Sequence, residues 1–128
     1  MSDYEKKKVL IADDDAIMRE LLKGILRTAG HTVTGEASNG EQVMALVEKA
    51  SPDVICLDIH MPKMDGMQCL EALKVSHPKL IIIMVSGEAT LQVVQGALAK
   101  GAGGFIVKPF NAAKVLDTIQ RVCAKQAA

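Results

Sequence analysis

Acidic side chains stand at two points where an apolar run of this 128-residue chain ends. Asp13 and Asp14 follow the run at residues 9–12, and Asp58 closes the run at residues 54–57. If both runs are parallel strands, their carboxyl ends lie at one edge of the sheet, where open α/β folds place their chemistry. Considered alone, Asp58 is explained about equally well as a residue that caps the following turn and as a residue of a reactive site. The other strand ends must therefore decide between the two interpretations.

A hydroxyl and an ammonium are expected at the same edge, because Ser86 and Lys108 follow the apolar runs at residues 80–85 and 104–107. Crowded carboxylates repel one another by on the order of 4 kcal/mol per pair at ~4 Å and an effective dielectric constant of ~20. Such a cluster takes up protons or holds a cation, and an all-oxygen site that keeps several waters suits Mg²⁺. Three carboxylates, one lysine and one Mg²⁺ then sum to zero charge. These are the groups needed to move a phosphoryl group onto a carboxylate.

The elements that must position these groups alternate regularly along the chain. Apolar or β-branched runs predict five strands, at residues 9–12, 32–34, 54–57, 80–85 and 104–107. The second run is less apolar than the others and is expected at the sheet edge. Each strand precedes a segment with helical spacing of its apolar residues. Five strands alternating with five helices predict an α/β fold with a parallel sheet covered on both faces.

Local signals indicate where the helices begin and which side they bury. Asp15, Asp65 and Asn111 are placed to cap helices, and Ser38 with Glu41 has the spacing of a capping box. The face that the first helix is expected to bury is made of Ile17, Leu21, Leu22, Ile25 and Leu26.

Composition limits the class of protein. With 49% hydrophobic and 23% charged residues the chain suits one globular domain with a single core. A formal net charge of zero and 2% aromatic residues argue against direct binding of nucleic acid. The run at residues 80–85 is too short to cross a bilayer, and the charged N-terminus is no secretory signal. Cys56, Cys69 and Cys123 lie in apolar surroundings, which favours free thiols in a reducing cytoplasm over disulfides or a zinc site.

Five motifs in register resemble those of a response-regulator receiver domain. They are Asp13-Asp14, Asp58 with Met61-Pro62 and Met64-Asp65-Gly66, Ser86-Gly87, Gly101-Ala102 through Phe105, and Lys108-Pro109-Phe110. The resemblance extends over about residues 8–125, so residues 1–128 are expected to form a single receiver domain, most similar to single-domain regulators of the CheY type. It implies the flavodoxin-like (βα)5 fold with strand order 2-1-3-4-5.

By this resemblance, Asp58 accepts a phosphoryl group from the phosphohistidine of a sensor histidine kinase or a phosphotransfer protein. Asp14 and Asp58 bind Mg²⁺ directly, the backbone carbonyl of His60 is a third ligand, and Asp13 acts through water. Lys108 holds one phosphoryl oxygen.

The resemblance also implies a conformational switch. Ser86 bonds a phosphoryl oxygen on activation, and Phe105 stands at the position that rotates inward when the hydroxyl residue moves. Many relatives have tyrosine there, so a hydrogen bond from a buried tyrosine hydroxyl is not available to this chain. A cis peptide bond is expected between Lys108 and Pro109.

Two positions near the acceptor are expected to set how long the phosphate survives. His60 lies two residues after Asp58, where chemotaxis regulators often carry asparagine, and Glu88 lies two residues after Ser86. Both positions tune phosphate lifetime in the family, and we hypothesise that both do so here.

The implied function is a phosphorylation-dependent signalling switch of a two-component system or phosphorelay, with chemotaxis among its candidate pathways. Such a protein is a cytoplasmic binding switch that assists its own phosphorylation and dephosphorylation. It is not an enzyme, it does not insert into a membrane, and it is a monomer or a weak phosphorylation-dependent dimer. Its downstream target is expected on the surface of the fourth helix, fifth strand and fifth helix. There, Leu91 and Val94 suit partner contact or, equally well, core packing.

Two other functions share the fold or the nucleophile. A phosphatase of the haloacid-dehalogenase type also uses a strand-end aspartate with Mg²⁺, but it requires Asp-x-Asp after the first strand. Asp58-Ile59-His60 has histidine at the third position. A flavodoxin-like binding protein needs a loop that accepts phosphate after the first strand, whereas residues 13–15 are all acidic and repel one.

Overall fold

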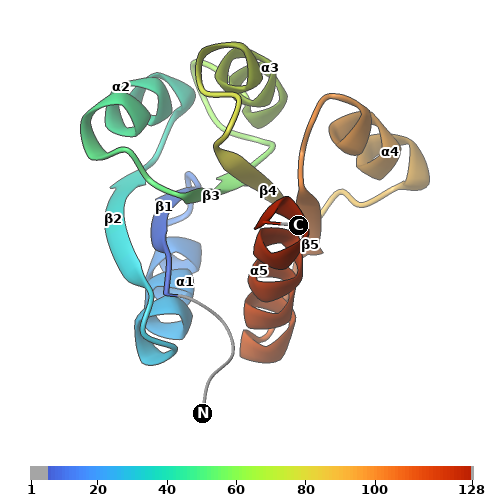
Figure 1. The fold of residues 1–128 in the computed structure, drawn as a ribbon. Helices are drawn as coiled ribbons and strands as arrows, with labels where there is room; N and C mark the ends of the chain where they lie inside the picture. The colour runs from blue at the N-terminus through green and yellow to red at the C-terminus, as the bar shows by residue number, and fades with distance from the viewer. Residues whose placement is uncertain (1–5, 128) are drawn as a thin grey trace.

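The computed structural model describes residues 6–127 and shows five successive β–α units. Their bounds are β1 (Lys8–Ala12), α1 (Ala16–Thr28), β2 (Thr32–Ala37), α2 (Gly40–Ala50), β3 (Val54–Asp58), α3 (Gly66–Ser76), β4 (Ile81–Ser86), α4 (Leu91–Ala99), β5 (Gly104–Val107) and α5 (Ala112–Ala127). The strands form one parallel sheet in the order β2-β1-β3-β4-β5 (Figure 1). The predicted fold, the strand order and the edge position of the second strand are confirmed.

Helices cover both faces of this sheet. α1 and α5 lie on one face, and α2, α3 and α4 lie on the other (Figure 1). Successive residues of a strand point to opposite faces. In β3, therefore, Ile55 and Leu57 join the core under α2, α3 and α4, whereas Val54 and Cys56 join the core under α1 and α5. Among residues 6–127, no helix has the combination of length and apolar composition needed to cross a membrane.

The strand register brings the functional strand ends to one edge. Every residue of β3 is buried, because the strand lies between β1 and β4 in the middle of the sheet. Ala12 of β1 is level with Leu57, and Asp58 is level with Val85 of β4. The residues that end or follow these strands therefore emerge side by side.

Side-chain caps begin the helices largely as predicted. Asp15, Asp65 and Asn111 each accept a hydrogen bond from a backbone N–H in the turn that follows. The predicted capping box of Ser38 and Glu41 is wrong, because α2 begins one residue later than the pattern suggested. Asn39 is the cap and accepts a hydrogen bond from the N–H of Gln42.

The predicted buried face of α1 is too wide. Leu22 and Leu26 are buried and Ile25 is partly buried, but Ile17 is 73% exposed and Leu21 is 45% exposed. α1 packs against β1, β2 and α5. These neighbours cover only the arc of the helix around Leu22 and Leu26, so the adjoining arc faces solvent.

The three cysteines form no disulfide with one another, in agreement with the prediction of reduced thiols. Cys56 and Cys69 are buried, and Cys123 is partly exposed. Burial raises the pKa of Cys56 to about 12 and that of Cys69 to about 11. Both therefore remain protonated at neutral pH and act as small apolar core residues.

Two glycines allow backbone segments to pack closely beside the acidic edge. A Cβ atom on Gly66, the first residue of α3, would lie 2.0 Å from the backbone oxygen of Asp58. One on Gly40 would lie 2.0 Å from the backbone oxygen of Met64. The N–H of Gly66 also donates to the carbonyl of Ile59 at 2.7 Å. Because main-chain atoms cannot move aside easily, only glycine lets the start of α3 lie against the end of β3.

Gly66→Ala should destabilise the fold by about 2 to 3 kcal/mol, because overpacking against the backbone outweighs the gain in helix propensity. Gly24→Ala in the middle of α1 is the matched control. A Cβ atom there would meet nothing within 4 Å, so this substitution should stabilise the protein by about 1 kcal/mol. Urea unfolding followed by circular dichroism measures both changes, and equal effects would contradict the close packing at Gly66.

Candidate functional site

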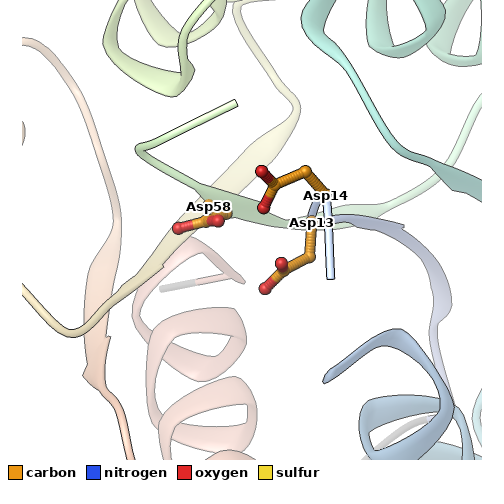
Figure 2. A group of neighbouring side chains, drawn as sticks. All are labelled: Asp13, Asp14 and Asp58. Carbon is orange, nitrogen blue, oxygen red and sulfur yellow. The ribbon is translucent and has the colours of Figure 1, made fainter. Parts of the chain in front are cut away.

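Three carboxylates meet where β1 and β3 end (Figure 2). Asp13 and Asp14 follow β1, and Asp58 is the last residue of β3. The carboxylate oxygens that they offer all lie within 4.8 Å of one another. Asp13 and Asp58 are buried, at 1% and 5% exposed, whereas Asp14 is exposed. The structure therefore brings together the three acidic residues singled out in the sequence and leaves the cluster open to solvent beside Asp14.

The ammonium of Lys108 reaches this cluster from the end of β5. Its Nζ donates to Oδ2 of Asp13 at 2.7 Å and lies 3.6 Å from Oδ2 of Asp58. Its backbone N–H donates to the carbonyl of Ser86 at 2.9 Å, and its peptide bond to Pro109 is cis, as expected. Burial alone would lower the pKa of Lys108, but the hydrogen bond to Asp13 and the charge of Asp58 outweigh burial and raise the pKa. Lys108 is therefore charged at neutral pH.

Asp58 is poorly stabilised as an anion. Burial and then the charge of Asp13 raise its pKa to about 6, and Asp14 adds to the rise. Lys108 and a backbone hydrogen bond from His60 oppose the shift but do not cancel it. With all three carboxylates ionised, the charges are −3 from the aspartates and +1 from Lys108, which leaves −2 at the edge of the sheet.

The donors in this cluster fit a small divalent cation. Each is a carboxylate oxygen, the hard ligand that Mg²⁺ prefers, and the exposure of Asp14 leaves space for the waters that Mg²⁺ retains. One dication would bring the charge of −2 to zero. The cluster can thus hold a metal ion beside a carboxylate that is a competent nucleophile.

Ser86 and His60 are connected through Glu88. The buried Oγ of Ser86, at the end of β4, accepts a hydrogen bond from the N–H of Glu88 at 3.0 Å. Oε1 of Glu88 lies 2.8 Å from Nε2 of His60, and both of these side chains are more than half exposed. The pair joins the loop after β3 to the loop after β4. Nothing in the sequence indicated that these two side chains touch.

Phe105 and α4 lie on the side of the molecule away from α1. Phe105 is partly buried and packs against the core cluster under α2, α3 and α4. Leu91 is 74% exposed, and Val94 is partly buried. Core packing is therefore wrong for Leu91, and its contact with a partner stays a prediction. Leu98 is also exposed, so α4 presents apolar side chains to solvent.

One residue that contacts the cluster was missed in the sequence. Arg19 of α1 donates from Nη1 to the backbone oxygen of Asp13 at 2.8 Å and from Nε to Oε1 of Glu36 at 3.1 Å. An arginine on an amphipathic helix is ordinarily a solvated surface residue. Only the packing of α1 against the ends of β1 and β2 makes it a partner of Asp13, so no local pattern could have identified it.

Comparison with known proteins agrees with this geometry. The model of the response regulator receiver domain family matches residues 9–120. The chain is 41% identical to the chemotaxis protein CheY of Bacillus subtilis over 114 residues, which cover 89% of this chain and 95% of that protein. It is 38% identical to the chemotaxis protein CheY of Thermotoga maritima over 116 residues, which cover 91% of this chain and 97% of that protein.

Solved structures show the same architecture. A chain in the CheX-CheY-BeF3-Mg²⁺ complex from Borrelia burgdorferi has a TM-score of 0.88 and 36% identity, over 91% of this chain and 88% of that chain. The chemotaxis protein CheY4 of Vibrio cholerae has a TM-score of 0.85 and 35% identity, over 92% of this chain and 99% of that chain. The similarity thus extends well beyond the motifs at the acidic edge.

Asp58→Asn should stabilise the protein in metal-free buffer near pH 7.5. The pKa of Asp58 is about 6 in the folded protein, against an ordinary value of 3.8. Above pH 6 the folded state therefore holds an ionised carboxylate at a cost on the order of 2 to 3 kcal/mol. This cost disappears as the pH falls below about 4, where the carboxyl group of Asp58 is protonated in both the folded and the unfolded protein. The stability gained by Asp58→Asn should therefore be largest above pH 6 and vanish below about pH 4. Thermal unfolding in the presence of EDTA, repeated across this pH range, measures it.

Asp117→Asn is the control for this measurement, because Asp117 is exposed on α5 and pairs with Arg121 at 3.6 Å. Exposed pairs of this kind contribute about 0 to 1 kcal/mol. A stability of Asp58→Asn no greater than that of Asp117→Asn at pH 7.5 would show that Asp58 is not strained by its neighbours.

Proposed function

The chain belongs to the response-regulator receiver domain family, and we propose that it is a phosphorylation-dependent signalling switch whose phosphate acceptor is Asp58. The observation that carries this proposal is the placement of Asp58. Asp58 is the last residue of β3, the buried central strand of the sheet. Its carboxylate lies beside those of Asp13 and Asp14 and is 3.6 Å from the ammonium of Lys108. The alternative, a phosphatase of the haloacid-dehalogenase type, has no support from the family match, and His60 occupies the position where that class requires aspartate.

In the proposed reaction, an oxygen of ionised Asp58 attacks the phosphorus of a phosphohistidine. The new P–O bond forms as the P–N bond breaks, and the leaving imidazole keeps the electron pair and takes up a proton. With a pKa of about 6, Asp58 is mostly ionised at neutral pH and more basic than an ordinary carboxylate. Lys108 lies where its ammonium can bind an oxygen of the phosphoryl group.

We propose that Mg²⁺ is held by the carboxylates of Asp13, Asp14 and Asp58 and by the backbone carbonyl of His60. When bound, Mg²⁺ supplies the positive charge that offsets the carboxylates and the phosphoryl oxygens. The related complex from Borrelia burgdorferi contains BeF3 and Mg²⁺, which supports the same requirement for this chain. Lys108 keeps Asp13 oriented by its 2.7 Å hydrogen bond.

Ser86 and Phe105 form the proposed switch. On activation, the Ser86 hydroxyl would donate to a phosphoryl oxygen. The loop after β4, whose Glu88 N–H now donates to Oγ of Ser86, would then change position. Phe105 would then rotate inward. Because Phe105 has no hydroxyl, packing alone stabilises its inward position.

The proposed partners are proteins on both sides of the signal. A sensor histidine kinase or a phosphotransfer protein donates the phosphoryl group, and a target protein binds the α4-β5-α5 face. Leu91 and Leu98 expose apolar area on α4, and the Borrelia relative occurs in a complex with CheX.

We place this activity in the cytoplasm, in a single receiver domain of about residues 8–125. This domain assists its own phosphorylation and dephosphorylation without being an enzyme. Chemotaxis is the candidate pathway, and the protein acts as a monomer or a weak dimer.

Incubation with a small-molecule phosphodonor and Mg²⁺ should place one phosphoryl group on the wild-type protein, and mass spectrometry detects it. Asp58→Asn should remain unmodified, and Lys108→Met should react about 100-fold more slowly because a donor to the transferring oxygens is lost. Asp15→Asn keeps a capping side chain at the start of α1 and should be phosphorylated as the wild type is. An unmodified wild type with a competent donor would refute the proposed function.

The side-chain pair of His60 and Glu88 should affect how long the phosphate lasts. The pair joins two loops beside the acceptor, so we expect its loss to open the approach of water to the phosphorylated aspartate. His60→Asn and Glu88→Ala should each speed dephosphorylation by about threefold, equivalent to ~0.7 kcal/mol in the barrier. The double variant should show little further change, because both substitutions remove the same contact.

Lys63→Met is the control for these decay rates, since Lys63 is an exposed residue of the same loop and pairs with Glu41 at 3.6 Å. Phosphate release after removal of the donor gives the rate for each variant. Equal decay in wild type and His60→Asn would rule out a role for this position in phosphate lifetime.

A further inference from the structure

Asp13 is fixed by protein groups at its backbone as well as at its side chain. Its N–H donates to the carbonyl of Ala37 at 3.0 Å. Its Oδ1 accepts from the N–H of Asp15 at 2.9 Å, and its Oδ2 accepts from Lys108 at 2.7 Å. The remaining polar atom, the carbonyl oxygen, accepts from Nη1 of Arg19 at 2.8 Å. Of these four partners, Arg19 is the one that reaches Asp13 from within a helix, α1.

The guanidinium of Arg19 is itself held in a defined orientation. Its Nε donates to Oε1 of Glu36 at 3.1 Å while its Nη1 donates to Asp13, and the side chain is only 19% exposed. A guanidinium is flat and rigid, so fixing Nε on one acceptor fixes the direction of Nη1. One planar group therefore connects the end of β2 to the end of β1.

Glu36 is anchored in turn by a second cation. Nζ of Lys23 donates to Oε2 of Glu36 at 2.6 Å, and Lys23 also pairs with Glu20 one turn earlier on α1. The hydrogen bond from Lys23 is the main cause that lowers the pKa of Glu36. Burial alone would raise this pKa, and the hydrogen bond from Arg19 helps to lower it. Glu36 is therefore a carboxylate at neutral pH, and the charged network ends at the carbonyl of Asp13.

We propose that Arg19 is a positioning residue for the cation site, which it serves by fixing the peptide unit between Asp13 and Asp14. The carbonyl of Asp13 and the N–H of Asp14 lie in one rigid plane. A hydrogen bond that holds the carbonyl therefore sets the direction in which Asp14 leaves the end of β1. In this role Arg19 would act through the backbone of Asp13 and would not itself contact the cation or the phosphoryl group. The inference rests on the proposed function, because it takes Asp13 and Asp14 as residues that hold Mg²⁺.

A role in stability alone and a role in positioning predict different measurements. If Arg19 only joins α1 to the sheet, its loss changes the free energy of unfolding and leaves the Mg²⁺ affinity of the folded protein unchanged. If Arg19 positions Asp14, its loss weakens Mg²⁺ binding by the folded protein. Lys23 offers the matched comparison, because it belongs to the same network and binds the same Glu36 without contacting Asp13.

Isothermal titration of the full chain with Mg²⁺ tests the proposal. Arg19→Met should raise the Mg²⁺ dissociation constant about tenfold, the usual size of effect for a group that orients a metal ligand, whereas Lys23→Met should stay within about twofold of wild type. The rate of phosphorylation by a small-molecule donor should fall for Arg19→Met at low Mg²⁺ and recover when Mg²⁺ is saturating. Unfolding in urea without Mg²⁺ records the stability of each variant.

Arg19→Lys provides a milder variant that keeps the positive charge and most of the stem. An ammonium is a point donor and cannot hold Asp13 and Glu36 in one plane, so Mg²⁺ affinity should fall between wild type and Arg19→Met. If Arg19→Met does not fold, Arg19→Lys decides the question alone, and an unchanged dissociation constant for it overturns the proposal.

The outcomes separate this inference from the function on which it rests. Wild type that binds no Mg²⁺ would defeat the proposed function. Wild type that binds Mg²⁺, with both Arg19 variants binding as tightly as Lys23→Met, would defeat only the positioning role. Equal weakening in Lys23→Met and Arg19→Met would also overturn it, because the effect would then belong to the network as a whole.

Discussion

In the described part of the chain, one ammonium faces three carboxylates at the carboxyl edge of the sheet, and this imbalance of charge is the constraint on which the site depends. Lys108 binds Asp13 at 2.7 Å and is 3.6 Å from Asp58, so its charge is shared and neither aspartate is fully neutralised. Burial and then the remaining negative charge raise the pKa of Asp58, and that charge makes a divalent cation the natural complement. A second lysine would neutralise the cluster further and remove the reason to bind a metal. The imbalance is therefore the feature that gives the site its chemistry.

Carboxylates that repel one another stay together only if the surrounding structure holds them. Asp58 belongs to a strand whose residues are all buried, and Gly66 allows α3 to press against the backbone of that strand. Asp13 is fixed at its N–H, its carbonyl and both carboxylate oxygens. Asp14, in contrast, is exposed. The rigid members of the cluster thus define its position, and in the proposed cation site the exposed Asp14 would complete the coordination of an incoming ion.

The sequence was sufficient for the features that depend on local pattern. Alternation of apolar runs with helical spacing predicted all five strands and helices, and the residues that end the strands predicted which side chains converge. Apart from the start of α2, where Asn39 and not Ser38 is the cap, errors arose where the outcome depended on neighbours distant in the chain. Ile17 has the spacing of a core residue, yet no element packs over its side of α1 enough to bury it. The contacts of Arg19 with Asp13 and of His60 with Glu88 join different loops or elements, so they have no signature within any short window of sequence.

The two departures from the usual receiver pattern bear on different steps of the proposed cycle. His60 and Glu88 lie outside the buried cluster and are joined to Ser86 through the backbone N–H of Glu88. In the proposed cycle, movement of Ser86 toward a phosphoryl group would disturb that N–H and hence the contact of Glu88 with His60. Phosphate lifetime and switching would then be coupled through Glu88. In the proposed switch, Phe105 would act at the other end of the same movement, where it packs against the core under α4. Because phenylalanine offers no hydrogen bond to hold an inward position, the balance between the two proposed states would depend on the loop contacts of Glu88 more than it would with tyrosine at position 105.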